Sequence, residues 1–197
     1  MRTPKTLHTP VSPEAVAALV SGDLIHLSGV VYTARDAAHQ RLVAQLQAGQ
    51  LLPFPLRNQA LFYVGPSPTP PGKIIGACGP TTGRRMDVYT PSLLANGLKI
   101  VIGKGPRSRE VIAAFKEYQA AYLVAIGGAA ALLAQSVKKA ELLAYPELGP
   151  EAVYRLEVEK MPLIVAIDSQ GRDLFALGPK AYAEEGAEGT GETANDA

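Results

Sequence analysis

A repeated succession of strand, loop and helix through the middle of the chain constrains the fold more than any other feature. Short apolar runs alternate with segments of helical periodicity, and glycine-containing loops separate them. The predicted strands are Lys73–Ala77, Lys99–Ile102 and Ala121–Ile126, and the predicted helices are Met86–Ala95, Arg109–Tyr118 and Gly127–Lys139. Such repeated units are typical of an α/β fold, in which helices form layers on a sheet.

The N-terminal segments predict further elements of the same domain. The run Ser12–Glu14 predicts the start of a short helix reaching Val20, because serine caps a helix and proline fits its first position. Residues 23–33 have a β-rich pattern, with an expected bulge or kink at Ser28–Gly29.

The C-terminal third predicts one more strand and then a change of composition. The apolar run Leu163–Ile167 is expected to be a buried strand, followed by a turn over Asp168–Asp173 and a hairpin return through Leu174–Phe175. Residues 180–197 are rich in Ala, Glu, Gly and Thr without apolar periodicity, which predicts a disordered acidic tail. We therefore expect one folded domain over residues 1–179.

Composition excludes several classes of protein. The 197 residues carry a net charge of +1, so no basic field would recruit nucleic acid. The longest apolar stretch, Tyr122–Leu133, is too short to span a bilayer, and the first ten residues lack the apolar core of a secretory signal. We expect a cytoplasmic protein with neither nucleic-acid nor membrane partners.

The cysteine and histidine content limits cofactor binding. One cysteine, Cys78, cannot form an internal disulfide or hold an iron–sulfur cluster, which needs three or four protein ligands. The histidines lack metal-ligand spacing, so no metal site is predicted. Cys78 and His26 lie among apolar neighbours and are expected to be buried structural residues.

The loop Gly79–Asp87 is the most informative polar segment. It follows a predicted strand and carries two threonines, Thr81 and Thr82, with two arginines, Arg84 and Arg85. In open α/β sheets ligands gather at the carboxyl ends of strands, and this set of donors suits a carboxylate or phosphate. An ordinary strand–helix turn with solvated arginines explains the same pattern about equally well.

Two further strand ends carry cations. Lys104 lies between Gly103 and Gly105, where it suits a second anion contact, although the pattern alone favours a flexible surface turn. Arg35 precedes a predicted helix that starts near Asp36, and its guanidinium suits a bidentate carboxylate contact. Asp36 is itself explained as a candidate helix cap.

These segments together carry a family resemblance. The runs TARDAAHQR, KIIGACGPTTGRRMD and IGKG, and the long stretch from AIGGAAALLAQ to DSQGRDLF, occur in order between about Leu24 and Phe175. In combination they resemble the β-subunit, or C-terminal domain, of class I iron–sulfur fumarases and L-tartrate dehydratases. The resemblance implies a swivelling β/β/α domain and an obligate α-subunit whose [4Fe–4S] cluster leaves one iron open to substrate. It also implies an α2β2 assembly in which this chain binds no cofactor.

The resemblance also assigns roles to four residues. It implies that Arg35, Arg85 and Lys104 bind the carboxylates of a C4 dicarboxylate, and that Thr81 is the catalytic group nearest the proton lost from carbon. Related chains commonly have small residues where this chain has Gly83 and Arg84, so Arg84 is a competing candidate. Arg85 is preferred because it directly precedes Met86 and Asp87.

The implied reaction is the reversible hydration of fumarate to malate by the assembled complex, with this chain inactive alone. L-Tartrate dehydration is the alternative within the same class. A stand-alone anion-binding domain, or a subunit that only orders its partner, is the alternative outside it.

Overall fold

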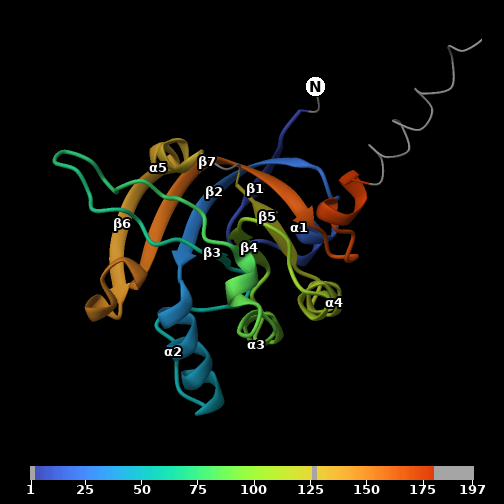
Figure 1. Cartoon of the computed structure of the whole chain (residues 1–197), viewed down its shortest axis with the longest axis horizontal. Coiled ribbons are helices and arrows are strands. Elements are labelled where there is room, and N and C mark those ends of the chain that lie inside the picture. The colour runs from blue at the N-terminus through green and yellow to red at the C-terminus, as the bar shows by residue number, and fades with distance from the viewer. Residues whose placement is uncertain (1–2, 126–127, 180–197) are drawn as a thin grey trace, which may run out of the picture.

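A closed sheet forms the centre of the fold. The structure, a computed structural model, describes residues 3–125 and 128–179. Its strands are β1 (Lys5–His8), β2 (Leu24–Thr33), β3 (Ala60–Phe62), β4 (Ile100–Gly103), β5 (Ala121–Val124), β6 (Val137–Ala144) and β7 (Val153–Ile167). They are ordered β1-β2-β3-β4-β5-β7-β6, and β2 also pairs with β7. The five strands β2, β3, β4, β5 and β7 therefore close into a barrel-like ring (Figure 1).

Short helices surround this ring. They are α1 (Pro13–Ala17), α2 (Asp36–Gln47), α3 (Thr90–Ala95), α4 (Arg109–Glu117) and α5 (Ala130–Ser136), with 3-10 helices η1 (Gly83–Met86) and η2 (Pro146–Glu151). Helices α2, α3 and α4 lie together on the lower side of the sheet in Figure 1, whereas α5 lies beside β6 and β7. The predicted α/β class is confirmed, with a sheet that closes on itself.

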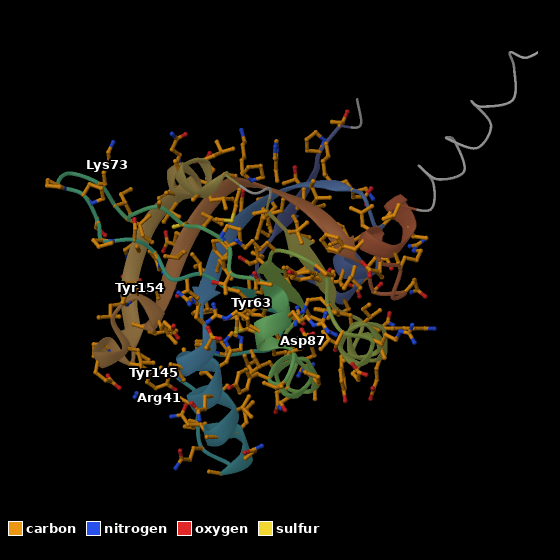
Figure 2. All side chains as sticks on the ribbon, in the orientation of Figure 1. Arg41, Tyr63, Lys73, Asp87, Tyr145 and Tyr154 are labelled. Carbon is orange, nitrogen blue, oxygen red and sulfur yellow. The ribbon has the colours of Figure 1, made fainter. Side chains whose placement is uncertain are left out.

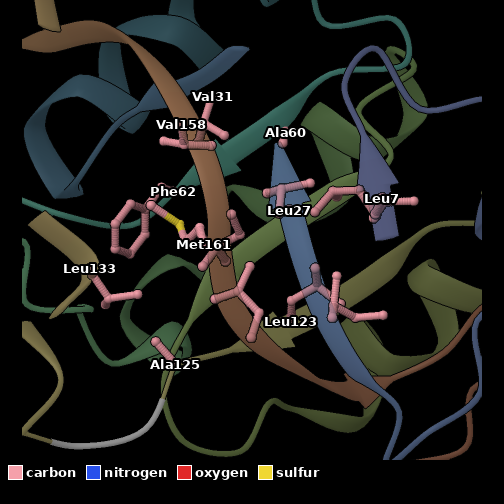
Figure 3. Packing of buried hydrophobic residues seen from close by; sticks show 14 of the residues in the cluster. Leu7, Leu27, Val31, Ala60, Phe62, Leu123, Ala125, Leu133, Val158 and Met161 are labelled. Atoms are coloured by element: carbon pink, nitrogen blue, oxygen red, sulfur yellow. The ribbon is translucent and has the colours of Figure 1, made fainter. Parts of the chain in front are cut away.

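Apolar side chains pack on both faces of the barrel wall. Ile100 and Ile102 of β4 belong to the cluster inside the curved sheet, which Figure 3 shows in part, whereas Val101 packs in a second cluster beneath α2, α3 and α4. Strands covered on both faces read as continuous apolar runs, which explains why the sequence showed no polar alternation there.

The predicted irregularity at Ser28–Gly29 is confirmed. The register between β2 and β7 shifts between Leu27 and Gly29. Gly29 has φ +108°, and a Cβ atom at this position would lie 2.4 Å from Thr9 Oγ1. Only glycine fits this close approach, and the bulge bends β2 so that the sheet can close. The predicted cap is also confirmed, because Ser12 Oγ accepts a hydrogen bond from Ala15 N at 3.2 Å.

The predicted strand Lys73–Ala77 is wrong. Residues 65–78 form an irregular arm, and Figure 2 shows Lys73 at its tip, far from the barrel. Ala77 bonds within the arm, through its N–H to Ser67 Oγ and its carbonyl from Ser67 N. The three prolines of residues 68–71 have no N–H to donate, so that side of the arm cannot offer residues 73–77 a complete strand partner.

The boundary predicted at Lys139 is also wrong. Helix α5 ends at Ser136 and residues Val137–Ala144 form β6, which pairs antiparallel with β7. Leu, Ala, Lys and Glu dominate β6 and favour helix, so pairing with β7 overrides local propensity. The predicted strand Leu163–Ile167 is only the end of the 15-residue strand β7.

The predicted hairpin at Leu174–Phe175 is replaced by a helical turn. Residues 174–179 are helical, and Asp173 caps them because its Oδ1 accepts from Phe175 N at 3.0 Å. The predicted tail, residues 180–197, lies outside the described residues. No helix within residues 3–125 and 128–179 is long and apolar enough to cross a membrane.

Candidate active-site edge

The cationic turns lie at one edge of the barrel. Strands β2, β3 and β4 run parallel, so their carboxyl ends share that edge. Arg35 follows β2 at the cap position of α2, and Lys104 directly follows β4. Thr82 pairs with Lys104 in an isolated parallel bridge, which adds the loop of Thr81 and Arg85 to the same edge.

Backbone hydrogen bonds fix Thr81 between two strand ends. Thr81 N donates to Tyr63 O at 2.6 Å, and Lys104 N donates to Thr81 O at 3.1 Å. Gly83 N then donates to Lys104 O at 2.8 Å. Within the part of the chain that the structure describes, neither the Thr81 hydroxyl nor the exposed Lys104 ammonium has a protein partner. Both groups are therefore available to a ligand.

A carboxylate joins Arg35 to Arg85. Asp36, the first residue of α2, accepts from Arg85 Nε at 3.1 Å and from Arg85 Nη2 at 2.9 Å. Arg35 Nη2 lies 3.7 Å from Asp36 Oδ2 and 3.4 Å from Glu151 Oε1. Two guanidinium groups from separate turns thus converge on one small carboxylate, which is the chemistry that a bound dicarboxylate would offer.

The sequence comparisons agree on one family. The profile of the family described as Fumarase C-terminus matches residues 4–178. The chain belongs to this family. This match confirms the family resemblance that the sequence motifs carry.

The relatives of this Fumarase C-terminus chain are hydratases and dehydratases. The aerobic class I fumarate hydratase of Escherichia coli is 42% identical over 153 residues, which are 77% of this chain and 28% of that protein. Fumarate hydratase 2 of Leishmania major is 40% identical over 157 residues, which are 79% of this chain and 28% of that protein. The chain thus spans less than a third of the fumarate hydratases that it matches. The L(+)-tartrate dehydratase subunit beta of Escherichia coli is 32% identical over 185 residues, which are 91% of this chain and 90% of that subunit.

The structure gives the two adjacent arginines of the Gly79–Asp87 loop different surroundings. Arg85 turns toward the start of α2, where it meets Asp36. Within the described residues, no hydrogen bond or ion pair joins Arg84 to Asp36. Hydrogen bonds at the start of α4 lower the pKa of Glu110, and the charges of Arg109 and Arg84 add to this shift. Arg85 is therefore the arginine of this pair that approaches the same carboxylate as Arg35.

Several residues that build this edge were not singled out from the sequence. Asp87, Thr90 and Arg107 form a buried polar group behind the turns, and Glu151 pairs with Arg35 from η2. Figure 2 shows Asp87 and Tyr63 close to α3, between the barrel and the outer helices. Arg107 lies in the loop after Lys104, but only its burial in the folded chain distinguishes it from a surface arginine.

The buried side chain of His39 contacts the backbone of the Arg35 turn. Its Nδ1 lies 2.8 Å from Arg35 O, and its ring packs edge-on against Tyr63 at 4.9 Å between centroids. The Nδ1–H tautomer donates to that carbonyl, because a carbonyl can only accept. Burial, helped by the nearby charge of Arg107, lowers the pKa of His39 to about 4, although the hydrogen bond to Arg35 O opposes this shift.

This low pKa predicts a loss of stability in acid. The unfolded chain binds the histidine proton near pH 6.5 and the folded chain only near pH 4, so stability present above pH 6.5 is lost as the pH falls toward 4. Between pH 7 and pH 4.5 we expect His39 to account for about 2.5 kcal/mol of the unfolding free energy. Urea unfolding at both pH values should show a smaller decrease for His39→Gln than for wild type, whereas His8→Gln should match wild type. Equal decreases for wild type and His39→Gln would contradict this assignment.

Gly83 leaves no space for a side chain. A Cβ atom at this position would lie 2.5 Å from Tyr122 Oη and 2.9 Å from Arg107 Cδ, both buried. We expect Gly83→Ala to lower the free energy of unfolding by about 1–3 kcal/mol, the usual cost of overpacking. Gly178→Ala is the control, because a Cβ atom there would meet nothing within 4 Å. Chemical denaturation of the two variants checks this, and equal stabilities would show that the turn can move away from Tyr122.

Proposed function

We propose that this chain is the β-subunit of an iron–sulfur hydro-lyase that hydrates fumarate reversibly to malate. In this proposal Arg35, Arg85 and Lys104 bind the two carboxylates of the substrate, and Thr81 lies at the carbon that loses a proton. The observation that carries the proposal is the convergence of these groups at one barrel edge, in a chain whose relatives are fumarate hydratases and a tartrate dehydratase subunit.

The charge of the edge suits this reaction. Removing a proton from the carbon next to a carboxylate moves negative charge onto that carboxylate in the transition state. Fixed cations stabilise the developing charge because they need no reorganisation when it appears. Arg35 and Arg85 come from different turns, so they can contact the dianion from two sides while Lys104 adds a third charge.

The carboxylates already at this edge do not prevent substrate binding. The side chain of Arg85 is 51% exposed and that of Asp36 is 32% exposed. An ion pair this accessible contributes at most about 1 kcal/mol. A dianion that contacts several cations at once can therefore displace Asp36 from Arg85 at little cost.

Thr81 has two possible roles in this scheme. A threonine hydroxyl holds its proton tightly, so it acts as a base only where nearby cations and backbone donors lower its pKa. Lys104, whose backbone bonds to Thr81 O, and Arg85 of the same loop are the candidate cations for this effect. In the second role Thr81 positions the substrate while a carboxylate of the partner transfers the proton.

The [4Fe–4S] cluster of such an enzyme belongs to the α-subunit in this proposal. This chain does not fit the role of cluster ligand, because burial raises the pKa of its single thiol, Cys78, to about 11. The cluster would supply a Lewis acid for the substrate hydroxyl. We propose an α2β2 assembly in the cytoplasm, in which this domain swivels against the α-subunit and is inactive alone.

Assays of the assembled complex test the proposal. This chain, co-expressed with a cysteine-bearing α-type partner of the same source, should convert malate to fumarate. L-Tartrate dehydratase is the second candidate, favoured by the 90% coverage of the Escherichia coli subunit beta. Activity on L-tartrate but not on malate would select it, and activity on neither would reject both.

A stand-alone binding domain is the remaining alternative. Isothermal titration of the purified single chain with malate separates it from the subunit proposal. Tight binding without a partner would favour that alternative, whereas a subunit that supplies only part of a site should bind malate weakly.

A further inference from the structure

A buried arginine lies directly behind the proposed substrate turns. The side chain of Arg107 is fully buried, whereas long cationic side chains usually reach solvent. Its guanidinium stacks over the rings of Tyr122 and Tyr63, at 4.8 Å and 5.6 Å from their centroids. The proposed reaction assigns no role to this charge, which cannot contact solvent.

Arg107 connects to the loop of Thr81 and Arg85. Its Nε donates to Asp87 Oδ1 at 2.6 Å, and its Nη2 donates to Thr90 Oγ1 at 2.7 Å. Asp87 is the C-cap residue of η1, two positions after Arg85. Gly83 of the same helix packs so closely on Arg107 that a Cβ atom would lie 2.9 Å from Arg107 Cδ.

The same group holds the turn of Lys104. Asp87 Oδ2 accepts from Ser108 N at 2.8 Å, so one carboxylate fixes both the end of η1 and the end of the Lys104 loop. Gly103 packs against Tyr122, where a Cβ atom would lie 3.0 Å from the hydroxyl. The two substrate turns therefore share one support, made of Arg107, Asp87 and Tyr122.

The support reaches the Arg35 turn as well. Tyr63 shares a hydrogen bond of 2.9 Å with Thr90 Oγ1, the atom that also accepts from Arg107. The ring of Tyr63 contacts His39, whose Nδ1 bonds to Arg35 O. All three turns thus rest on a continuous set of buried side chains centred on Arg107.

We infer that Arg107 is a positioning residue that sets the separation of the Thr81–Arg85 and Lys104 turns so that both contact one substrate dianion. This inference rests on the proposed function and deepens it. Arginine is required because its planar fork contacts Asp87 and Thr90 at the same time, a geometry that the single ammonium of lysine cannot reproduce. Buried ion pairs often add little to stability, whereas a displacement of about 1 Å at a reacting group can lower rates by about 10²-fold.

Steady-state kinetics of the αβ complex test this role. We expect Arg107→Lys to lower kcat/KM for malate by about 10²-fold, with kcat reduced as well as KM raised. Arg109→Lys, an exposed arginine two residues on, should match wild type. Leu7 is a buried residue of β1 that belongs to a different apolar cluster from Tyr63 and Tyr122, so Leu7→Ala should lower stability and leave kcat/KM within about threefold of wild type. Equal kinetics for Arg107→Lys and Leu7→Ala would overturn the inference.

Hydrogen exchange of the full chain alone tests the support without relying on activity. The amides of Thr81, Gly83 and Lys104 should exchange at least tenfold faster in Arg107→Lys than in Leu7→Ala. The amides of β1 should not exchange faster in Arg107→Lys than in Leu7→Ala. If Arg107→Lys does not fold, Asp87→Asn keeps the shape of the acceptor and should show the same local change. Unchanged exchange in the folded variants would overturn the inference. An inactive wild-type complex would reject the proposed function instead, and the exchange rates would still decide whether Arg107 holds the turns.

Discussion

Replacing Thr81 by valine is expected to lower kcat of the assembled complex by about 10²- to 10⁴-fold, the range for losing a group that transfers a proton. Valine keeps the shape of threonine and removes only the hydroxyl. The described structure gives that hydroxyl no protein partner, and the backbone bonds of Thr81 to Tyr63 and Lys104 remain. The fold should therefore be unaffected, and steady-state kinetics with malate measure the loss.

A control one residue further on separates chemistry from local structure. Thr82 is exposed in the same loop, so Thr82→Val should stay within about threefold of wild type. Thr81→Ser retains a hydroxyl and should recover most of the rate. Near wild-type kcat in Thr81→Val would contradict any role of the hydroxyl in proton transfer. A raised KM with unchanged kcat would assign it to substrate positioning.

Replacing Arg85 by alanine is expected to lower kcat/KM by about 10²- to 10³-fold, the scale for losing one preorganised charge contact in the transition state. The change also leaves Asp36 without its bidentate partner, next to the place where the substrate dianion must bind. Repulsion between these anions adds to the loss, so the KM for malate should rise together with the fall in kcat.

The neighbouring arginine is the matched control for this prediction. Arg84 has the same charge and stands one residue earlier, but of these two arginines only Arg85 pairs with Asp36 within the described residues. Arg84→Ala should stay within about threefold of wild type. Equal losses in the two variants would mean that the loop acts only through its total charge, and a larger loss in Arg84→Ala would reverse the assignment.

The sequence predicts the local features of this fold better than its closure. The Ser12 cap and the bulge at Gly29 depend on short-range rules of backbone geometry, and both are present. Closure depends on the pairing of β2 with β7, in which Leu24 lies opposite Ile164, and no local pattern specifies a contact between residues so distant. Strand β6 could not be predicted either, because its residues favour helix until β7 is beside them.

The candidate site also combines residues that local sequence patterns indicate with residues that only the folded chain reveals. Arg35 and Lys104 could be chosen as candidates because strand ends in parallel sheets meet at one edge, and the structure places them there. Thr81 follows no strand, since the predicted strand Lys73–Ala77 is wrong, and it reaches this edge through its backbone bonds to Tyr63 and Lys104. Arg107 could not be chosen, because its burial depends on the packing of Tyr63 and Tyr122 around it. Glu151 was missed for a related reason, since only the folded chain brings η2 to Arg35.

A structure of the assembled αβ complex with a bound dicarboxylate tests the central claim most directly. We expect one dianion to lie at this barrel edge with Arg35, Arg85 and Lys104 each within hydrogen-bond distance of its carboxylates, and with Asp36 displaced from Arg85. A dicarboxylate bound elsewhere, with the Asp36–Arg85 pair intact, would contradict it.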